Sequence, residues 1–154
     1  MDRWDAVSET LLFSAARRDH VANVVAPRLA AGTWVVCDRY IDSTIAYQGY
    51  GRGLPIDELM AIQRFASGNL WPDLTLILDL TVLEGFRRAA GRAGAADRFE
   101  RLDHEFHERL RSGFLRIARD NPGRCAVIDA SGDVMAVQRA ICAAVTQRLA
   151  IRLA

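Results

Sequence analysis

An acid and a fixed cation stand side by side at Asp38-Arg39, directly after a short apolar run. Phosphoryl transfer uses such a pair, because the acid orients Mg²⁺ or its water while the guanidinium holds phosphate oxygens. A structural salt bridge at the end of a strand would explain the pair as well. The residues that follow favour the chemical interpretation. They offer groups that can hydrogen-bond the edge of a base and stack on its ring, and glycines that let the backbone approach a ligand: Ser43, Thr44, Tyr47 and Gln48, with Gly49, Gly51 and Gly53.

Phe13 and Arg17 form a second candidate pair. They are four residues apart in a segment with helical spacing of its apolar residues, so they share one face of the expected helix. An aromatic ring and a guanidinium on one stripe could stack on a base and read its acceptor edge. The alternative is an ordinary amphipathic helix, with Phe13 in the core and Arg17 in solvent.

Helices and strands alternate along the chain, which predicts an α/β fold with a parallel sheet. Three apolar runs are typical of buried strands, and each ends at or beside an aspartate: Asp38, Asp79 and Asp129. Ligands of such folds bind at the carboxyl ends of the strands. The expected strands are 33–37, 74–80 and 125–129. The expected helices are about 8–26, 27–31, 55–67, 98–119 and 133–149, with a further helix that starts at 81. Ser8 or Thr10 could cap the first helix, and a polar, glycine-rich segment is expected between 38 and 55.

Composition sets limits on the class of protein. The 154 residues, 51% hydrophobic and 25% charged, suit one soluble domain, 1–154, and contain no apolar run as long as a membrane span. The acidic, polar first residues are unlike a secretory signal, so we expect a cytoplasmic protein and no membrane partner. The net charge is +1, and the arginines are not gathered into one basic run, which argues against a nucleic-acid-binding module.

All 20 basic residues are arginine, so the chain offers guanidinium groups for phosphate but no lysine. The three cysteines are widely spaced and predict neither a disulfide framework nor a zinc site. His104 and His107, with i, i+3 spacing, could bind a metal ion, although a solvated helix face explains them more simply.

Several blocks of the sequence together carry a family resemblance. The segments LLFSAARRDH (11–20), GTWVVCDRY (32–40), STIAYQGYGRG (43–53), WPDLTLILDL (71–80), ADRFE (96–100) and VIDA (127–130) resemble, in order and spacing, those of bacterial thymidylate kinases. The resemblance covers essentially the whole chain. It implies a P-loop-kinase-like, three-layer fold, a parallel sheet flanked by helices, and ATP-dependent phosphorylation of dTMP to dTDP for dTTP biosynthesis.

The resemblance also implies roles for individual residues. Phe13 would stack on thymine and Arg17 would hydrogen-bond it, while Arg39 would clamp the dTMP phosphate with Asp38 beside it near Mg²⁺. Four polar residues would close over the base and sugar: Ser43, Thr44, Tyr47 and Gln48.

A lid is expected at about 87–98, because RRAAGR (87–92) followed by Asp97-Arg98 resembles the lid of the bacterial subtype whose catalytic arginine comes from that segment. Arg92 is the first candidate for this group and Arg88 the second, and Arg92 and Arg98 are the lid residues expected near ATP. The alternative for each is a solvent-facing helix charge. A mobile arginine can stabilise the transferring group while closure excludes water.

Family members should open with a strand, a GxxxxGK[ST] loop and a helix, and no such loop occurs here. We therefore expect a chain truncated at its N-terminus that lacks the first, central strand and the P-loop, and that is poorly stable and inactive alone. The alternative is a non-catalytic remnant, or a fragment that only pairs with kinase subunits. The full-length family implies a homodimer.

Overall fold

The computed structural model describes residues 4–90 and 103–151. By its internal contacts the chain divides into two compact units, Met1–Trp71 and Pro72–Ala154. The expected lid arginines Arg92 and Arg98 lie outside the described residues. No helix in the described part of the chain is long and apolar enough to cross a membrane.

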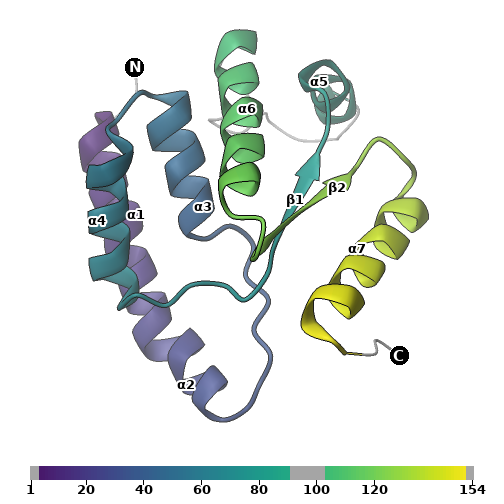
Figure 1. Cartoon of the computed structure of the whole chain (residues 1–154). Helices are drawn as coiled ribbons and strands as arrows, with labels where there is room; N and C mark the ends of the chain where they lie inside the picture. The colour runs from purple at the N-terminus through teal and green to yellow at the C-terminus, as the bar shows by residue number, and fades with distance from the viewer. Residues whose placement is uncertain (1–3, 91–102, 152–154) are drawn as a thin grey trace. The chain divides into compact units, whose positions relative to one another are not determined.

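The first unit is helical and starts with α1 (Ala6–His20), followed by a π-helical turn, η1 (Val21–Val25), and α2 (Ala26–Ala30) (Figure 1). Asp5 caps α1, its carboxylate accepting the backbone N–H groups of Val7 and Ser8. The prediction that Ser8 or Thr10 begins this helix is therefore wrong. The Thr10 hydroxyl instead donates to the carbonyl of Ala6 within the helix.

The predicted break at Pro27 becomes a change of helix type. Pro27 lies at the start of α2, and the backbone stays right-handed helical through both junctions with η1. A proline ring clashes with the carbonyl four residues earlier, and the wider π turn just before it gives that carbonyl room. A helix ending at about residue 26 and a second, short helix were expected, and the structure has one continuous helical path whose geometry changes.

The segment 33–37 is not a strand, which corrects a sequence prediction. Trp34 is 64% exposed and Val36 98% exposed. An extended apolar segment becomes a strand only when a neighbour pairs with its backbone groups, and no strand in the described part of the chain pairs with this segment. The apolar, β-branched composition predicted a strand, but hydrogen bonding to a neighbouring strand decides whether one forms.

The glycine-rich segment after Tyr40 is helical, whereas the sequence was interpreted as irregular there. Helix α3 (Ile41–Thr44) continues as the π-helix η2 (Ile45–Gly51), and α4 (Ile56–Ser67) follows. Ile41 and Ala46 are fully buried, so apolar burial overrides the poor helix propensity of the hydroxyls and glycines. A Cβ on Gly49 would collide with the side chain of Ile56, which shows how closely η2 packs on α4.

The second unit contains two parallel strands, β1 (Thr75–Asp79) and β2 (Cys125–Asp129), paired from Thr75 opposite Cys125 to Asp79 opposite Asp129. Helix α5 (Val82–Ala90) follows β1, and α6 (His104–Asp120) and α7 (Val134–Leu149) contact the strands and flank them (Figure 1). The α/β class with a small parallel sheet flanked by helices is thus confirmed, as are the strands at 75–79 and 125–129.

Candidate nucleotide site

Arg17 is the centre of a hydrogen-bond network in the first unit. Its guanidinium donates to the Oε1 atom of Gln63, to the Tyr40 carbonyl at 3.2 Å and to the Thr44 hydroxyl at 3.0 Å. It also lies over the Tyr40 ring, 5.4 Å from the centroid. Burial lowers the pKa of Arg17, with nearby Tyr40 opposing that shift. The alternative of a solvated Arg17 is therefore not what the structure shows.

Gln63 holds Arg17 through a chain of bonds with a fixed direction. The Ser14 hydroxyl donates to the Thr10 carbonyl at 2.7 Å, so its lone pair accepts the Gln63 Nε2–H at 2.9 Å. That leaves Gln63 Oε1 facing the guanidinium. Gln63 has no exposed surface and Ser14 is 5% exposed, so the bonds that fix Gln63 are buried between α1 and α4, and its bond to Arg17 is partly buried.

Phe13 lies on the same stripe of α1 as Arg17, one turn earlier, and 43% of it is exposed. The alternative of a core Phe13 does not hold for this structure. An exposed ring beside a fixed cation provides a stacking surface with a donor at its edge, which is what a planar heterocycle with a carbonyl group requires.

Arg39 has a left-handed backbone, with φ of 64°, a conformation that costs a non-glycine residue about 1–3 kcal/mol. Its guanidinium lies 5.0 Å from the centre of the Tyr47 ring. Strain of this kind persists where the surroundings fix it, and here it lies at a residue whose cationic side chain is exposed. Asp38, next to it, is also exposed.

Thr44 and Gln48 are buried, and Ser43 and Tyr47 are half-buried. Thr44 binds Arg17, and the Gln48 Nε2–H donates to Glu9 Oε1 at 3.0 Å. The structure thus links Arg17 to Thr44 and Gln48 to Glu9, and it places Phe13 on the same face of α1 as Glu9 and Arg17. Sequence reasoning missed the polar partners of these residues, whose only signal was their place beside the named residues: the buried Glu9, Ser14 and Gln63, and the half-buried Tyr40.

Arg88 belongs to the second unit. It pairs with Glu84 and donates to the carbonyls of Ala130 at 3.0 Å and Ser131 at 2.9 Å, which ties α5 to the loop after β2. Bonds from Arg87 and Arg88 lower the pKa of Glu84 to about 2. Thr81 and Glu84 have the spacing of a capping box, and half of it is formed. The Thr81 hydroxyl accepts the Glu84 N–H, while the Glu84 carboxylate binds these arginines.

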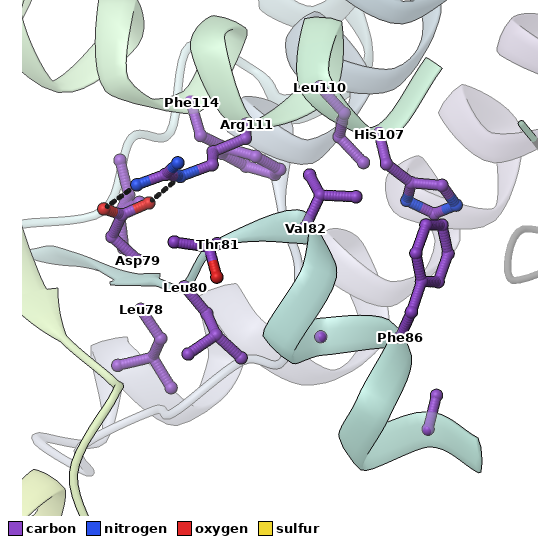
Figure 2. Close-up of a pocket in the computed structure, with 13 residues that line it drawn as sticks. Leu78, Asp79, Leu80, Thr81, Val82, Phe86, His107, Leu110, Arg111 and Phe114 are labelled. Carbon is purple, nitrogen blue, oxygen red and sulfur yellow. Dashed lines mark hydrogen bonds and ion pairs between the residues drawn. The ribbon is translucent and has the colours of Figure 1, made fainter. Parts of the chain in front are cut away.

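A cavity of about 280 Å³ lies at the carboxyl end of β1, and Figure 2 shows the side chains around it. Asp79 accepts two bonds from Arg111, at 2.7 and 2.9 Å. The rings of Phe86 and His107 are nearly perpendicular, with their centroids 4.9 Å apart. Arg111 holds the pKa of Asp79 below its usual value. None of the predicted site residues that the structure describes lines this cavity.

No group of three or more His, Cys, Asp or Glu side chains gathers into a metal site within 4–90 and 103–151. His104 lies 3.9 Å from Glu108 and contacts Phe86, so in this structure it belongs to the helix surface. Proteins bind Mg²⁺ through one or two carboxylates and substrate phosphates, and the exposed Asp38 could contribute one such carboxylate oxygen. No residues of this chain match the loop that binds the phosphates of ATP, because the sequence contains no GxxxxGK[ST] motif and no lysine.

Comparison with known proteins indicates the family to which the chain belongs. A small parallel sheet flanked by helices defines the chain as an α/β protein, and the thymidylate kinase family model matches residues 2–141. The chain is 51% identical over 150 residues to a thymidylate kinase of Caulobacter vibrioides, covering 97% of this chain and 72% of that protein. It is 53% identical over 146 residues to one of Bradyrhizobium sp. strain BTAi1, covering 94% of this chain and 65% of that protein. A third relative, from Cereibacter sphaeroides, is 50% identical over 153 residues.

The chain therefore belongs to the thymidylate kinase family, whose name denotes phosphotransferases. It spans between about two thirds and 72% of the length of the relatives compared. The family resemblance inferred from the sequence blocks is confirmed.

Proposed function

We propose that this chain carries the dTMP-binding part of a kinase that phosphorylates dTMP to dTDP with ATP. Relatives named thymidylate kinase, at about 50% identity over nearly the whole chain, support this activity over a non-catalytic remnant. The observation that carries the proposal within the chain is the Arg17 network beside the exposed Phe13, with Arg39 nearby in the sequence of the same unit.

The proposed contacts fall into two groups, one for the base and sugar of dTMP and one for its phosphate. Phe13 stacks on the thymine ring and Arg17 donates to its carbonyl edge, while Ser43, Thr44, Tyr47 and Gln48 enclose the base and sugar. Arg39 holds the phosphate as a guanidinium fork, the geometry that suits two phosphate oxygens. Its strained backbone and its contact with the Tyr47 ring keep it aimed before the ligand arrives, which reduces the entropy lost on binding.

Asp38 is the residue we propose for Mg²⁺, an ion that would neutralise phosphate charge when bound. Arg92, Arg88 and Arg98 stay candidates for the lid. The residues of this chain do not form a cradle for the phosphates of ATP, so we propose no productive ATP binding and no turnover by this chain alone.

The test is binding rather than turnover, measured by isothermal titration calorimetry with dTMP and with thymidine, which lacks the phosphate. The wild type should bind dTMP at least about tenfold more tightly than thymidine, because a charge-assisted bond to phosphate contributes about 1.5–3 kcal/mol. Arg39→Ala should remove that preference and leave thymidine affinity unchanged. Arg28→Ala, which removes an exposed arginine on α2, is the matched control and should keep it. A wild type that binds neither compound would contradict the proposed function.

A homodimer is the second part of the proposal. Helix α1 and the turn after it expose a set of large apolar side chains that an isolated chain would leave in water: Val7, Leu11, Leu12 and Val24, each between 45% and 51% exposed. Light scattering should give twice the chain mass, and Leu11→Glu with Leu12→Glu should give the monomer. The free thiols of Cys37, Cys125 and Cys142 suit the reducing cytoplasm we propose as its compartment.

A further inference from the structure

Arg17 holds the residue that directly follows Arg39. Its guanidinium donates to the Tyr40 carbonyl at 3.2 Å, and its Cζ atom lies 5.4 Å from the centre of the Tyr40 ring. The same carbonyl also accepts the Ser43 N–H at 3.2 Å, and the Tyr40 hydroxyl donates to the Leu70 carbonyl at 3.3 Å. Tyr40 is therefore fixed through its carbonyl, its ring and its hydroxyl, and Arg17 contacts both the carbonyl and the ring.

These contacts restrict the backbone of Arg39. Arg39 has a φ of 64°, and such a conformation persists in a non-glycine residue only where its surroundings impose it. Because Tyr40 is the next residue, contacts that hold Tyr40 limit the backbone angles open to Arg39. The Cys37 thiol lies 3.4 Å from the Arg39 carbonyl oxygen, but a thiol is a weak donor. The charged guanidinium of Arg17 is the stronger constraint.

The two arginines also contact the same helical segment, which consists of α3 and η2. Arg17 donates to the Thr44 hydroxyl at 3.0 Å, and the Cζ atom of Arg39 lies 5.0 Å from the centre of the Tyr47 ring. Thr44 and Tyr47 are three residues apart. Arg17 thus fixes the backbone that leaves Arg39 and also the helical segment against which the Arg39 guanidinium lies.

Arg17 can hold this backbone and still donate to a ligand. Its Nη2 atom bonds to Tyr40 and Thr44, which uses both hydrogens of that nitrogen, and its Nη1 atom bonds to Gln63. The Nε–H group has no partner among residues 4–90 and 103–151. Holding Tyr40 and donating to a base therefore use different N–H groups.

We propose that Arg17 is a positioning residue for Arg39: through the Tyr40 backbone it sets the preference for a phosphorylated ligand, although it does not touch the phosphate. This inference rests on the proposed function, because it deepens the same dTMP site. In the proposed function Arg17 serves the base alone. Here it also links recognition of the base to recognition of the phosphate.

The experiment measures affinities of the whole chain for dTMP and for thymidine by calorimetry, in the wild type and in Arg17→Met. Both ligands should bind the variant more weakly, because the base loses a donor. The dTMP-to-thymidine affinity ratio should also fall about fivefold, since the strained Arg39 backbone would then have to be imposed when the phosphate binds. A residue that only contacts the base, or only stabilises the fold, would weaken both ligands alike and leave the ratio unchanged.

Two control variants separate this effect from loss of charge and from loss of a base contact. Arg18→Met removes the same charge from an exposed position of α1 and keeps the Arg17–Tyr40 bond, so the ratio should stay at the wild-type value. Phe13→Leu removes the ring proposed to stack on the base and also keeps that bond. It should weaken dTMP and thymidine by the same factor.

The possible results are distinguishable. A wild-type ratio in Arg17→Met overturns the inference while the proposed function stands. An equal fall of the ratio in either control variant overturns it as well, because charge or base contact would then explain the effect. A wild type that binds no dTMP overturns both the inference and the proposed function.

A second measurement uses the wild type alone and covers the case in which Arg17→Met does not fold. Rotation about the Cζ–Nη2 bond of Arg17, followed by NMR of the Nη2 protons, should be restricted in the free chain and stay restricted when dTMP is bound. Faster rotation in the dTMP complex would mean that Arg17 releases Tyr40 to bind the nucleotide, and it would overturn the inference.

Discussion

The two units of the chain bury different kinds of side chain. Within the described residues, every buried polar or charged side chain lies in the first unit: Glu9, Thr10, Ser14, Asp42, Thr44, Gln48, Gln63 and Ser67. The second unit buries apolar groups, such as Ile77, Phe106 and Ile117, and keeps its main ion pair, Asp79–Arg111, partly exposed. Buried polar networks cost stability unless every bond is made, and they fix side chains in one arrangement.

This difference gives the two units different roles: the first positions side chains of the candidate site, and the second forms an ordinary supporting core. The first unit holds Arg17 and Gln48 in fixed directions through partners that an apolar core could not provide. The second unit resembles an ordinary core, where hydrophobic burial with complementary packing is enough. The comparison predicts that substitutions of similar size will have different consequences in the two units.

The largest effect should come from Arg17→Met, which removes the guanidinium but keeps much of the side-chain volume. We expect dTMP affinity to fall between about tenfold and a hundredfold, because hydrogen bonds to a charged group contribute about 1.5–3 kcal/mol. Arg18→Met, on the exposed neighbouring position of α1, should leave the affinity unchanged in the same calorimetric titration. Equal affinity losses in both variants would show that general charge, and not the Arg17 network, attracts the nucleotide.

Gln63→Leu should destabilise the chain by about 1–3 kcal/mol, since it leaves the Ser14 hydroxyl and part of Arg17 without their buried partner. In the second unit, Ile117→Val removes one buried methylene and should cost about 0.5–1.5 kcal/mol. Urea denaturation of both variants makes the comparison. A neutral or stabilising Gln63→Leu would show that the buried polar network does not contribute to stability in the way expected here.

Two glycine substitutions should act in opposite directions. Gly49→Ala places a methyl group against Ile56 and within 3.2 Å of Leu59, and this overpacking should cost about 1–3 kcal/mol. Gly85→Ala, in α5, meets no atom within 4 Å and should stabilise that helix by about 0.5–1 kcal/mol. Thermal unfolding should therefore lower the midpoint for the first variant and raise it for the second, and shifts of the same sign would contradict the packing argument.

The smallest effect concerns pH. Arg111 lowers the pKa of Asp79 below its usual 3.8, so the unfolded chain binds this proton more readily than the folded one. The pair's stabilisation is therefore present above about pH 4 and is lost as acid protonates Asp79 in the folded state. Screening by solvent limits it to about 1 kcal/mol or less. In Arg111→Met the acid-dependent loss of unfolding free energy should be smaller by that amount. An unchanged acid dependence would show that the ion pair does not contribute to stability.

The sequence predicted the elements whose signal is local. The strands at 75–79 and 125–129 are continuous apolar runs, and α4 and α7 carry clear boundaries, so these were confirmed. The segment 33–37 failed because a strand needs a partner, which composition does not show. The helix at Ile41–Gly51 was missed because its hydroxyls and glycines favour turns, whereas burial of Ile41 and Ala46 decided the outcome.

The candidate site was predictable in the members whose side-chain chemistry or family resemblance marks them. Phe13, Arg17 and Arg39 have side chains whose chemistry suggests a nucleotide, and the family resemblance named them. Glu9 and Gln63 are ordinary helix residues in the sequence, and their importance depends on contacts between residues 39 and 46 positions apart. Long-range pairing of that kind has no local signature.

Hydrogen exchange followed by mass spectrometry, with and without saturating dTMP, tests most directly whether the first unit carries the nucleotide site. The account predicts slower exchange in α1 and in the segment from Asp38 to Gly51, with β1, β2 and α7 unchanged. Protection confined to β1, β2 and the helices of the second unit, or no protection anywhere at saturating dTMP, would contradict it.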